Sequence, residues 1–229
     1  MITLNPIGII HSPYQEKFGI PRQPNLVPAG KGELHLIAPY NHPDIVRGLE
    51  QFSHLWLLFI FTQTMNKGWK NTVRPPRLGG NEKLGVFATR STFRPNPIGL
   101  SAVELNEIIT QGEQIILKLG SLDLMDGTPI IDIKPYIPYS DSYPNASAGY
   151  SQMPPNATLQ IQFTELALNQ LAHKPQLHAL ISQVIAQDPR PAYKKSKTDL
   201  QIYGLTLDHH NIKWSVSKEI ATILSVESN

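Results

Sequence analysis

Residues 1 to about 140 contain short apolar or alternating runs that glycine, proline and asparagine separate. Runs of this length and period predict β-strands bounded by turns. Full-length helix patterns do not alternate with them, which argues against a doubly wound parallel sheet. We therefore expect a mainly β fold with a closed or nearly closed barrel. The predicted strands are residues 7–12, 33–38, 55–62, 84–89, 100–105, 114–120 and 129–136.

Helical spacing is confined to two regions. Residues 42–52 predict one short helix, because Pro43 suits a first helical turn and Asn41 is a candidate cap. Beyond residue 163, apolar residues recur at three- and four-residue intervals, which predicts amphipathic helices. The clearest members are Leu177, Leu180, Ile181, Val184 and Ile185.

The helical region belongs to a second pattern that begins near residue 158. It has a strand at 157–163, the helices, and then three strands, which predicts a small α+β domain. The stretch before it, residues 141–157, is rich in serine, proline, asparagine and alanine and is typical of a linker. The predicted organisation is a β-barrel domain at 1–140, a linker at 141–157 and an α+β domain at 158–229.

Composition places the chain among folded globular proteins, with 41% apolar and 17% charged residues. It has no cysteine, which excludes disulfides and cysteine-containing zinc sites. The N-terminus lacks signal-peptide features, and the longest apolar run, Leu55 to Phe61, is too short to cross a bilayer. We expect a cytoplasmic protein with no membrane partner.

Positive charge is concentrated although the net charge is only +2. Residues 67–94 hold seven basic side chains and one acidic side chain, Glu82. A second cluster contains Arg190, Lys194, Lys195 and Lys197. Proline and aromatic residues interleave both clusters, as in surfaces that bind phosphates and stack bases. The alternative is that both clusters are ordinary solvated loops.

Common catalytic signatures are missing. The chain has no Gly-x-Gly-x-x-Gly turn, no P-loop and no Gly-x-Ser-x-Gly elbow, and its eight histidines are scattered. We therefore expect no metal, and a hydrolase is disfavoured. The remaining candidates for a site are polar residues that lie beside glycine and proline in loops at the ends of predicted strands. Glycine and proline in a loop hold neighbouring side chains in fixed geometry. Simple tight turns are the competing interpretation.

Three carboxylates follow one another within ten residues of the 122–136 stretch. Asp126 and Gly127 predict a turn, with Asp123 before it and Asp132 on the next strand. A residue between two isoleucines of a strand faces the side opposite to them. Asp132 is an ordinary surface residue if that side faces water, and a base or an anchor if it lines a barrel mouth.

Several of these stretches together resemble the TsaA/YaeB-type family, over most of the chain from Ile7 to about Tyr193. The characterised members of that family are S-adenosylmethionine-dependent tRNA methyltransferases. The stretches that carry the resemblance are FGIPRQ, FSHLWLLF, RPPRLGG, GVFATRSTFRPNPIGLS, GSLDLMDGTPIIDIKPY and QDPRPAY.

The resemblance implies a single-sheeted β-barrel that binds S-adenosylmethionine, a small C-terminal domain and a homodimer. It implies methylation of N6 of N6-threonylcarbamoyladenosine at position 37 of threonine tRNA. The implied cofactor contacts are Gln23, Gln63, Thr64, Arg90, Leu100, Leu122, Asp123 and Leu124.

The chemistry of that reaction suggests further roles. N6 is a poor nucleophile, so a base is useful, and the candidate catalytic residues are Asp126, Asp132 and Tyr136, which match family elements. The threonyl carboxylate calls for a two-pronged cation, for which we choose Arg94, with Asn96 beside the modified base. The remaining candidate RNA contacts are Arg74, Arg77, Arg190, Tyr193 and Lys194. A non-catalytic RNA-binding barrel is the alternative.

Overall fold

The computed structural model describes residues 3–155, 158–191, 194 and 201–229. Contacts divide the chain into two compact units, each of which is built from more than one chain segment. The first unit comprises residues 1–11, 33–120 and 127–154, and the second comprises 12–32, 121–126 and 155–229.

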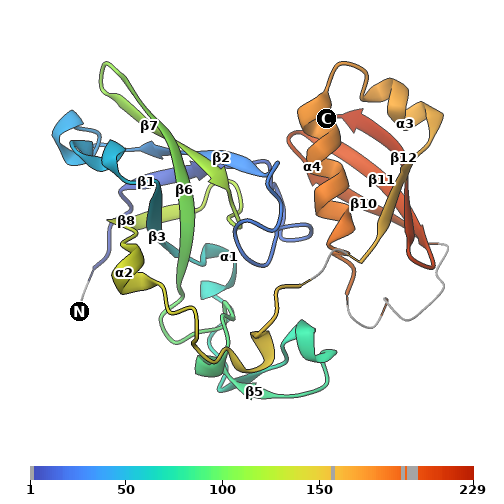
Figure 1. The fold of residues 1–229 in the computed structure, drawn as a ribbon, viewed down its shortest axis with the longest axis horizontal. Helices are drawn as coiled ribbons and strands as arrows, with labels where there is room; N and C mark the ends of the chain where they lie inside the picture. The colour runs from blue at the N-terminus through green and yellow to red at the C-terminus, as the bar shows by residue number, and fades with distance from the viewer. Residues whose placement is uncertain (1–2, 156–157, 192–193, 195–200) are drawn as a thin grey trace. The chain divides into compact units, whose positions relative to one another are not determined.

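The first unit is organised around a closed six-stranded barrel with the strand order β1-β2-β7-β6-β3-β8 (Figure 1). Strand β1 pairs in antiparallel fashion with both β2 and β8, which closes the sheet. This confirms the predicted barrel. The strands are β1 (Gly8–His11), β2 (Lys31–Leu36), β3 (His54–Ile60), β6 (Ile98–Gln111), β7 (Gln114–Ser121) and β8 (Pro129–Pro135).

Alternation along each strand decides which residues fill the barrel. In β3, Leu55, Leu57 and Phe59 are buried while the residues between them are partly exposed. The interior is close-packed opposite Phe59, because a Cβ atom added to Gly99 would lie 2.2 Å from the Phe59 ring. Gly99 of β6 is the register partner of Phe59, so glycine leaves the space that the aromatic ring occupies.

The predicted strand at residues 84–89 is wrong beyond its first two residues. Leu84–Gly85 (β5) pairs with Thr72–Val73 (β4) in a two-stranded sheet outside the barrel, and Val86–Ala88 then forms a 3-10 helix, η4. Within this turn Val86 is buried whereas Phe87 is 76% exposed. The apolar run therefore belongs to a turn rather than to a barrel strand.

The predicted helix at residues 42–52 is replaced by two 3-10 helices, η1 (Pro43–Val46) and η2 (Leu49–Gln51). Gly48 separates them with a φ of 86°, a conformation that glycine adopts without strain. The cap of η1 is His42, whose side chain accepts a hydrogen bond from the Asp44 amide, and not Asn41. The other short elements of this unit are α1 (Thr62–Met65), η3 (Pro76–Leu78), α2 (Pro138–Asp141) and η5 (Gly149–Ser151).

The second unit contains a four-stranded sheet in the order β10-β11-β12-β9 and two helices that pack against it (Figure 1). These elements follow the α+β pattern expected from the sequence. Helix α4 buries the apolar stripe that the spacing predicted. The elements are β9 (Gln160–Phe163), α3 (Glu165–Gln170), α4 (Pro175–Ala186), β10 (Ile202–Leu207), β11 (His210–Ser217) and β12 (Ile220–Ser228).

Residues 13–16 lie along the end of β10, the edge strand of this sheet. Tyr14 forms an isolated antiparallel bridge with Leu207, and the Asp208 amide donates to the Pro13 carbonyl at 2.9 Å. Covering an edge in this way blocks pairing with another chain. The second unit thus uses residues from outside 158–229, while the predicted domain boundaries stay a prediction. Among the described residues, no helix is long and apolar enough to cross a membrane.

A buried ion pair follows α4. Arg190 donates to both carboxylate oxygens of Asp188, at 2.8 Å from Nε and 3.1 Å from Nη2. The two side chains are only 3% and 4% exposed. Hydrogen bonding to the Asp188 carboxylate raises the pKa of Arg190, so the guanidinium stays charged throughout the ordinary pH range.

This pair generates a stability prediction. Replacing Arg190 by alanine leaves the Asp188 charge buried, and we expect a loss of about 3–5 kcal/mol in the free energy of unfolding. The double variant Asp188→Ala/Arg190→Ala should lose less, because no isolated charge remains. Urea denaturation measures all three.

The matched control is Lys213→Ala, which removes an exposed pair with Glu227 in the same unit. We expect a loss of less than about 1 kcal/mol there. An Arg190→Ala variant no less stable than Lys213→Ala would contradict the assignment.

Candidate functional site

The outer face of β6, β3 and β8 brings two of the predicted site residues into one row. Leu58 of β3 is the register partner of Leu100 on one side and of Asp132 on the other. Neighbouring strands lie about 4.8 Å apart, so the row spans roughly 10 Å. Leu100 is 48% exposed, which is a large apolar surface for a barrel strand. A carboxylate and an exposed leucine therefore share one open face.

Asp132 does not line the barrel interior. Its neighbour Ile133 pairs with buried Leu57, so alternation turns the carboxylate outward. Its Oδ1 accepts from the Ile133 amide at 2.9 Å, and Oδ2 lies 2.9 Å from Nζ of Lys134. The side chain is 43% exposed, so solvent or a ligand reaches it directly. Of the two alternatives for Asp132, the structure supports the one in which its side of the strand faces water.

Tyr136 begins an aromatic cluster just after β8. Its amide donates to the His54 carbonyl, and its ring centroid lies 5.5 Å from that of Trp56. The Trp56 indole donates to Asp141, which also accepts from the Ile137 amide, both at 2.9 Å. The Ile137 amide and then the indole hold the pKa of Asp141 below its usual range. Tyr136 is thus fixed on the same side of β3 that carries Asp132.

The basic loop before β6 is folded around Arg94. Nη1 of Arg94 donates to the Thr89 carbonyl at 2.7 Å, and the Thr89 hydroxyl donates to the Val86 carbonyl at 2.8 Å. The guanidinium carbon also lies 5.8 Å from the Phe87 ring centroid. Part of the Arg94 donor capacity therefore holds the loop itself, while Arg90 and Asn96 are exposed on it.

Helix α1 is attached to this loop. The buried Thr64 hydroxyl lies 3.3 Å from the Thr92 carbonyl, which it reaches as a donor, so this side chain has a structural contact already. Gln63 beside it is exposed. Of the two residues expected on the cofactor from this helix, Gln63 has the accessible side chain, and Thr64 positions the loop.

The second unit carries the remaining cofactor and carboxylate candidates. Leu122 and Leu124 are buried, so their side chains pack inside the unit. The Leu122 amide donates to the Gly30 carbonyl at 2.9 Å, and the Leu124 carbonyl accepts from the Ser12 hydroxyl at 2.8 Å. Asp123 lies between the leucines and is only partly buried. Asp123 and Asp126 are thus both partly accessible carboxylates of this stretch.

Asp126 links its turn to a distant segment, whereas Gln23 bonds within its own loop. Oδ1 of Asp126 accepts from the Ser12 amide at 3.0 Å, and the Gln23 amide donates to the Arg22 carbonyl. Asp126 thus ties the end of β1 to the turn before β8. These contacts are consistent with a positioning role for Asp126.

Tyr14, which no sequence pattern indicates, lies beside the turn of Asp126, whose amide donates to the Tyr14 carbonyl at 2.9 Å. It is buried, and a Cβ atom added to Gly30 would lie 1.9 Å from its hydroxyl oxygen. That oxygen has no hydrogen-bond partner among the described residues. Burial, and then the charge of Asp123, raise the pKa of Tyr14 strongly. Any side chain at position 30 would clash with the Tyr14 ring. Space for the ring, and not a positive φ, therefore explains the glycine at this position.

The candidate RNA contacts fall into different environments. Arg74 and Arg77 are exposed, and Arg77 donates to the Met153 carbonyl. Lys194 donates to Gln201 at 2.7 Å, and Tyr193 lies outside the described residues. The expectation that Arg190 contacts RNA is corrected, because its guanidinium is buried and paired with Asp188.

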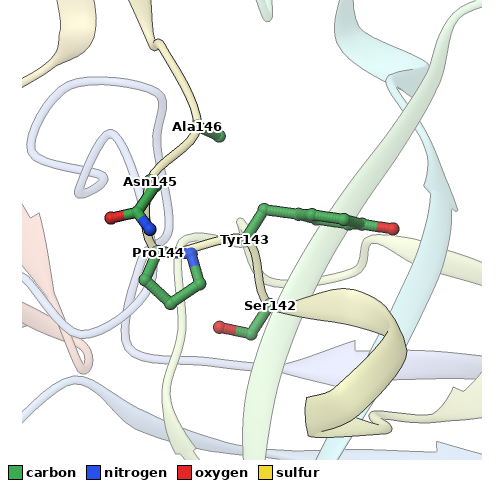
Figure 2. A pocket seen from close by; sticks show the side chains of 5 residues that line it. All are labelled: Ser142, Tyr143, Pro144, Asn145 and Ala146. Atoms are coloured by element: carbon green, nitrogen blue, oxygen red, sulfur yellow. The ribbon is translucent and has the colours of Figure 1, made fainter.

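A surface hollow at Ser142, Tyr143, Pro144, Asn145 and Ala146 is shown in Figure 2. Its lining consists of five consecutive residues of one loop, and none of the candidate site residues contributes to it. The hollow follows from the course of this loop alone and adds no group to the site.

Comparison with known proteins gives matches along almost the whole chain. Residues 9–142 match the tRNA-methyltransferase O N-terminal domain, and residues 156–229 match the TrmO C-terminal domain. The tRNA (adenine(37)-N6)-methyltransferase of Escherichia coli is 56% identical over 96% of each chain. A Pseudomonas aeruginosa protein named "Putative S-adenosylmethionine-dependent methyltransferase RcsF" is 45% identical, over 93% of this chain and 91% of its own.

Solved structures agree with the sequence matches. The crystal structure of TrmO from Pseudomonas aeruginosa superposes with a TM-score of 0.80 at 37% identity, covering 100% of this chain and 99% of that one. The two family domains and the solved structure point to the same family, and together they cover both the barrel and the small α+β region. The chain therefore belongs to the tRNA-methyltransferase O family.

Proposed function

We propose that this protein transfers a methyl group from S-adenosylmethionine to N6 of adenosine 37 in tRNA. The observation that carries the proposal is the 56% identity, over 96% of both chains, to a protein named for that reaction. Both halves of the chain match domains of one enzyme family, so the whole protein and not only its barrel is accounted for.

The proposed substrate in full is N6-threonylcarbamoyladenosine of threonine tRNA, in the anticodon loop. Its threonyl carboxylate is an anion, and the basic loop at 86–97 offers Arg94 as its partner. Bases of an anticodon loop are partly unstacked, so an enzyme reaches them without opening a duplex. We further propose that the protein acts in the cytoplasm as a homodimer, as the family resemblance implies.

The residues present fit S-adenosylmethionine in the chemistry of their donors and acceptors. In the first unit, exposed Leu100 offers an apolar surface for an adenine ring, and Arg90 offers a cation for a carboxylate. In the second unit, the Asp123 carboxylate accepts hydrogen bonds from an ammonium or from ribose hydroxyls. Gln63 and Gln23 add amide groups that donate and accept. S-adenosylmethionine supplies an electrophilic methyl group on its sulfonium.

Asp132 is our choice for the base although it lies on the outer wall and not at a barrel mouth, because it shares one outward row with Leu100, the proposed cofactor contact. N6 loses one proton as the new carbon–nitrogen bond forms, and the exposure of this carboxylate on the Leu100 face supports its role as the acceptor of that proton. Lys134 holds Oδ2 of this carboxylate and thereby fixes its orientation. Asp126 instead holds the Ser12 amide, which favours a positioning role. Tyr136 stays a candidate for contact with the base ring.

The cofactor residues give a binding prediction. Leu100→Asp introduces a charge on the apolar contact, and Gln23→Ala removes an amide, so both should weaken S-adenosylmethionine binding by roughly tenfold or more. Isothermal titration calorimetry measures the affinity. Leu166→Asp, at an exposed leucine of α3, is the matched control and should bind as the parent does. Parent-like affinity in both test variants would place the cofactor elsewhere.

The base gives a turnover prediction. Asp132→Asn should keep cofactor affinity and lower methyl transfer by about 10²–10⁴-fold, the usual contribution of a general base. Transfer of labelled methyl groups to threonylcarbamoylated tRNA measures this, with unmodified transcript as the substrate control. Asp126→Asn should lose about 1 kcal/mol of stability and retain most turnover when folded.

Full turnover in Asp132→Asn would remove that carboxylate from the mechanism. A parent protein that binds the tRNA but transfers no methyl group would instead favour the non-catalytic RNA-binding barrel.

A further inference from the structure

Two large aromatic side chains are exposed within the basic segment 67–94. Trp69 is 57% exposed and Phe87 is 76% exposed. Scattered exposed apolar residues are ordinary in proteins. These two differ because both belong to segment 67–94, which carries most of the positive charge of the first unit. The chain near Trp69 and the chain near Phe87 are two neighbouring stretches of this segment. We call Trp69, Lys70, Phe87, Phe93 and Arg94 the basic-aromatic surface.

Hydrogen bonds hold the two stretches together. The Lys70 amide donates to the Phe93 carbonyl at 3.2 Å, and the Val86 amide donates to the Asn71 carbonyl at 2.9 Å. The β4–β5 pairing continues the same contact, with Thr72 opposite Gly85. Trp69 and Phe87 are each adjacent in sequence to a residue of these bonds. The exposed rings are therefore carried by a fixed framework and not by isolated loop tips.

Cations lie against the aromatic rings of this surface. Nζ of Lys70 is 4.7 Å from the Phe93 centroid, and the guanidinium carbon of Arg94 is 5.8 Å from the Phe87 centroid. Both distances are within the range of cation–π contact. Segment 67–94 as a whole has seven basic residues and only Glu82 as an acidic one. Such a surface combines phosphate attraction with faces on which bases stack.

Charge argues against a second copy of the chain as the occupant. A two-fold interface places the same patch on both partners, so it would bring two strongly positive segments together. A polyanion with exposed aromatic rings is complementary to the same surface. Tyr139 offers a contrast, since it is 91% exposed but lies two residues from Asp141 and outside the basic segment.

We propose that Trp69 and Phe87 form a stacking platform for unpaired bases of the tRNA anticodon loop. Lys70 draws the adjacent phosphates to this platform. Stacking tolerates any base, so the platform supplies affinity and holds the loop, while recognition of the modified adenosine lies elsewhere. This inference rests on the proposed function, because it takes the RNA to be that of the methylated anticodon loop.

Affinity for an anticodon stem-loop RNA tests the platform first. Trp69→Ala and Phe87→Ala should each weaken binding by about tenfold, the usual effect of losing one base–aromatic stack. Trp69→Phe should retain most of the affinity, because an aromatic face remains. Tyr139→Ala is the matched control and should bind RNA as the parent does. Calorimetry with S-adenosylmethionine should give the same affinity for all four variants.

Tryptophan fluorescence tests stacking itself. Adding the stem-loop to the parent should quench emission, and the quenching should be largely lost in Trp69→Phe, which keeps the other two tryptophans. A fully paired duplex of equal length carries the same phosphates without loop bases, and it should quench far less. Because Trp69 is exposed, its replacement leaves the core intact.

The possible results separate this inference from the proposed function. Unchanged RNA affinity in Trp69→Ala and Phe87→Ala, with methyl transfer intact, would overturn the platform and leave the proposed function standing. Loss of a dimer in these variants at unchanged RNA affinity would make the surface an interface between copies, which also overturns it. A parent that neither binds nor methylates tRNA would overturn the proposed function.

Discussion

Antiparallel pairing of β1 with both β2 and β8 closes the barrel, and the candidate site of the first unit depends on that closure. A closed sheet has no free edge, and alternation assigns every strand residue to the inside or the outside. Register then places Leu100, Leu58 and Asp132 in one outward row across three strands. A slip of the register by one residue would turn the side chains of this row into the core. The packing of Leu57 and Phe59 inside the barrel therefore determines which side chains face outward.

The candidate site residues are held without a glycine-rich phosphate loop, which the sequence lacks. Rigidity comes instead from polar contacts within loops and between them. Arg94 binds the carbonyls of its own loop, Thr64 attaches α1 to that loop, and Asp126 ties the Ser12 amide to the turn before β8. Each contact satisfies a buried or half-buried backbone group and at the same time fixes a candidate residue. Stability and placement of the site therefore share the same interactions.

The sequence predicted most strands because alternation in a half-buried sheet is a local signal. It was wrong at residues 84–89, where an apolar run without alternation forms a short pair and a turn. It was also wrong about Arg190, because a buried partner two residues away, Asp188, looks the same in sequence as a solvated one. Strand pairing between distant residues and burial determine the structure at these positions, and neither can be read from a local pattern. The outward position of Asp132 likewise required the pairing with Leu58, which no local pattern contains.

Mass spectrometry of nucleosides from tRNA of cells with and without this protein tests the central claim most directly. We expect N6-methyl-N6-threonylcarbamoyladenosine in cells that have the protein and its unmethylated precursor in cells that lack it. Restoring the parent chain should restore the methyl group, whereas Asp132→Asn should not. Equal amounts of the methylated nucleoside with and without the protein would contradict the account.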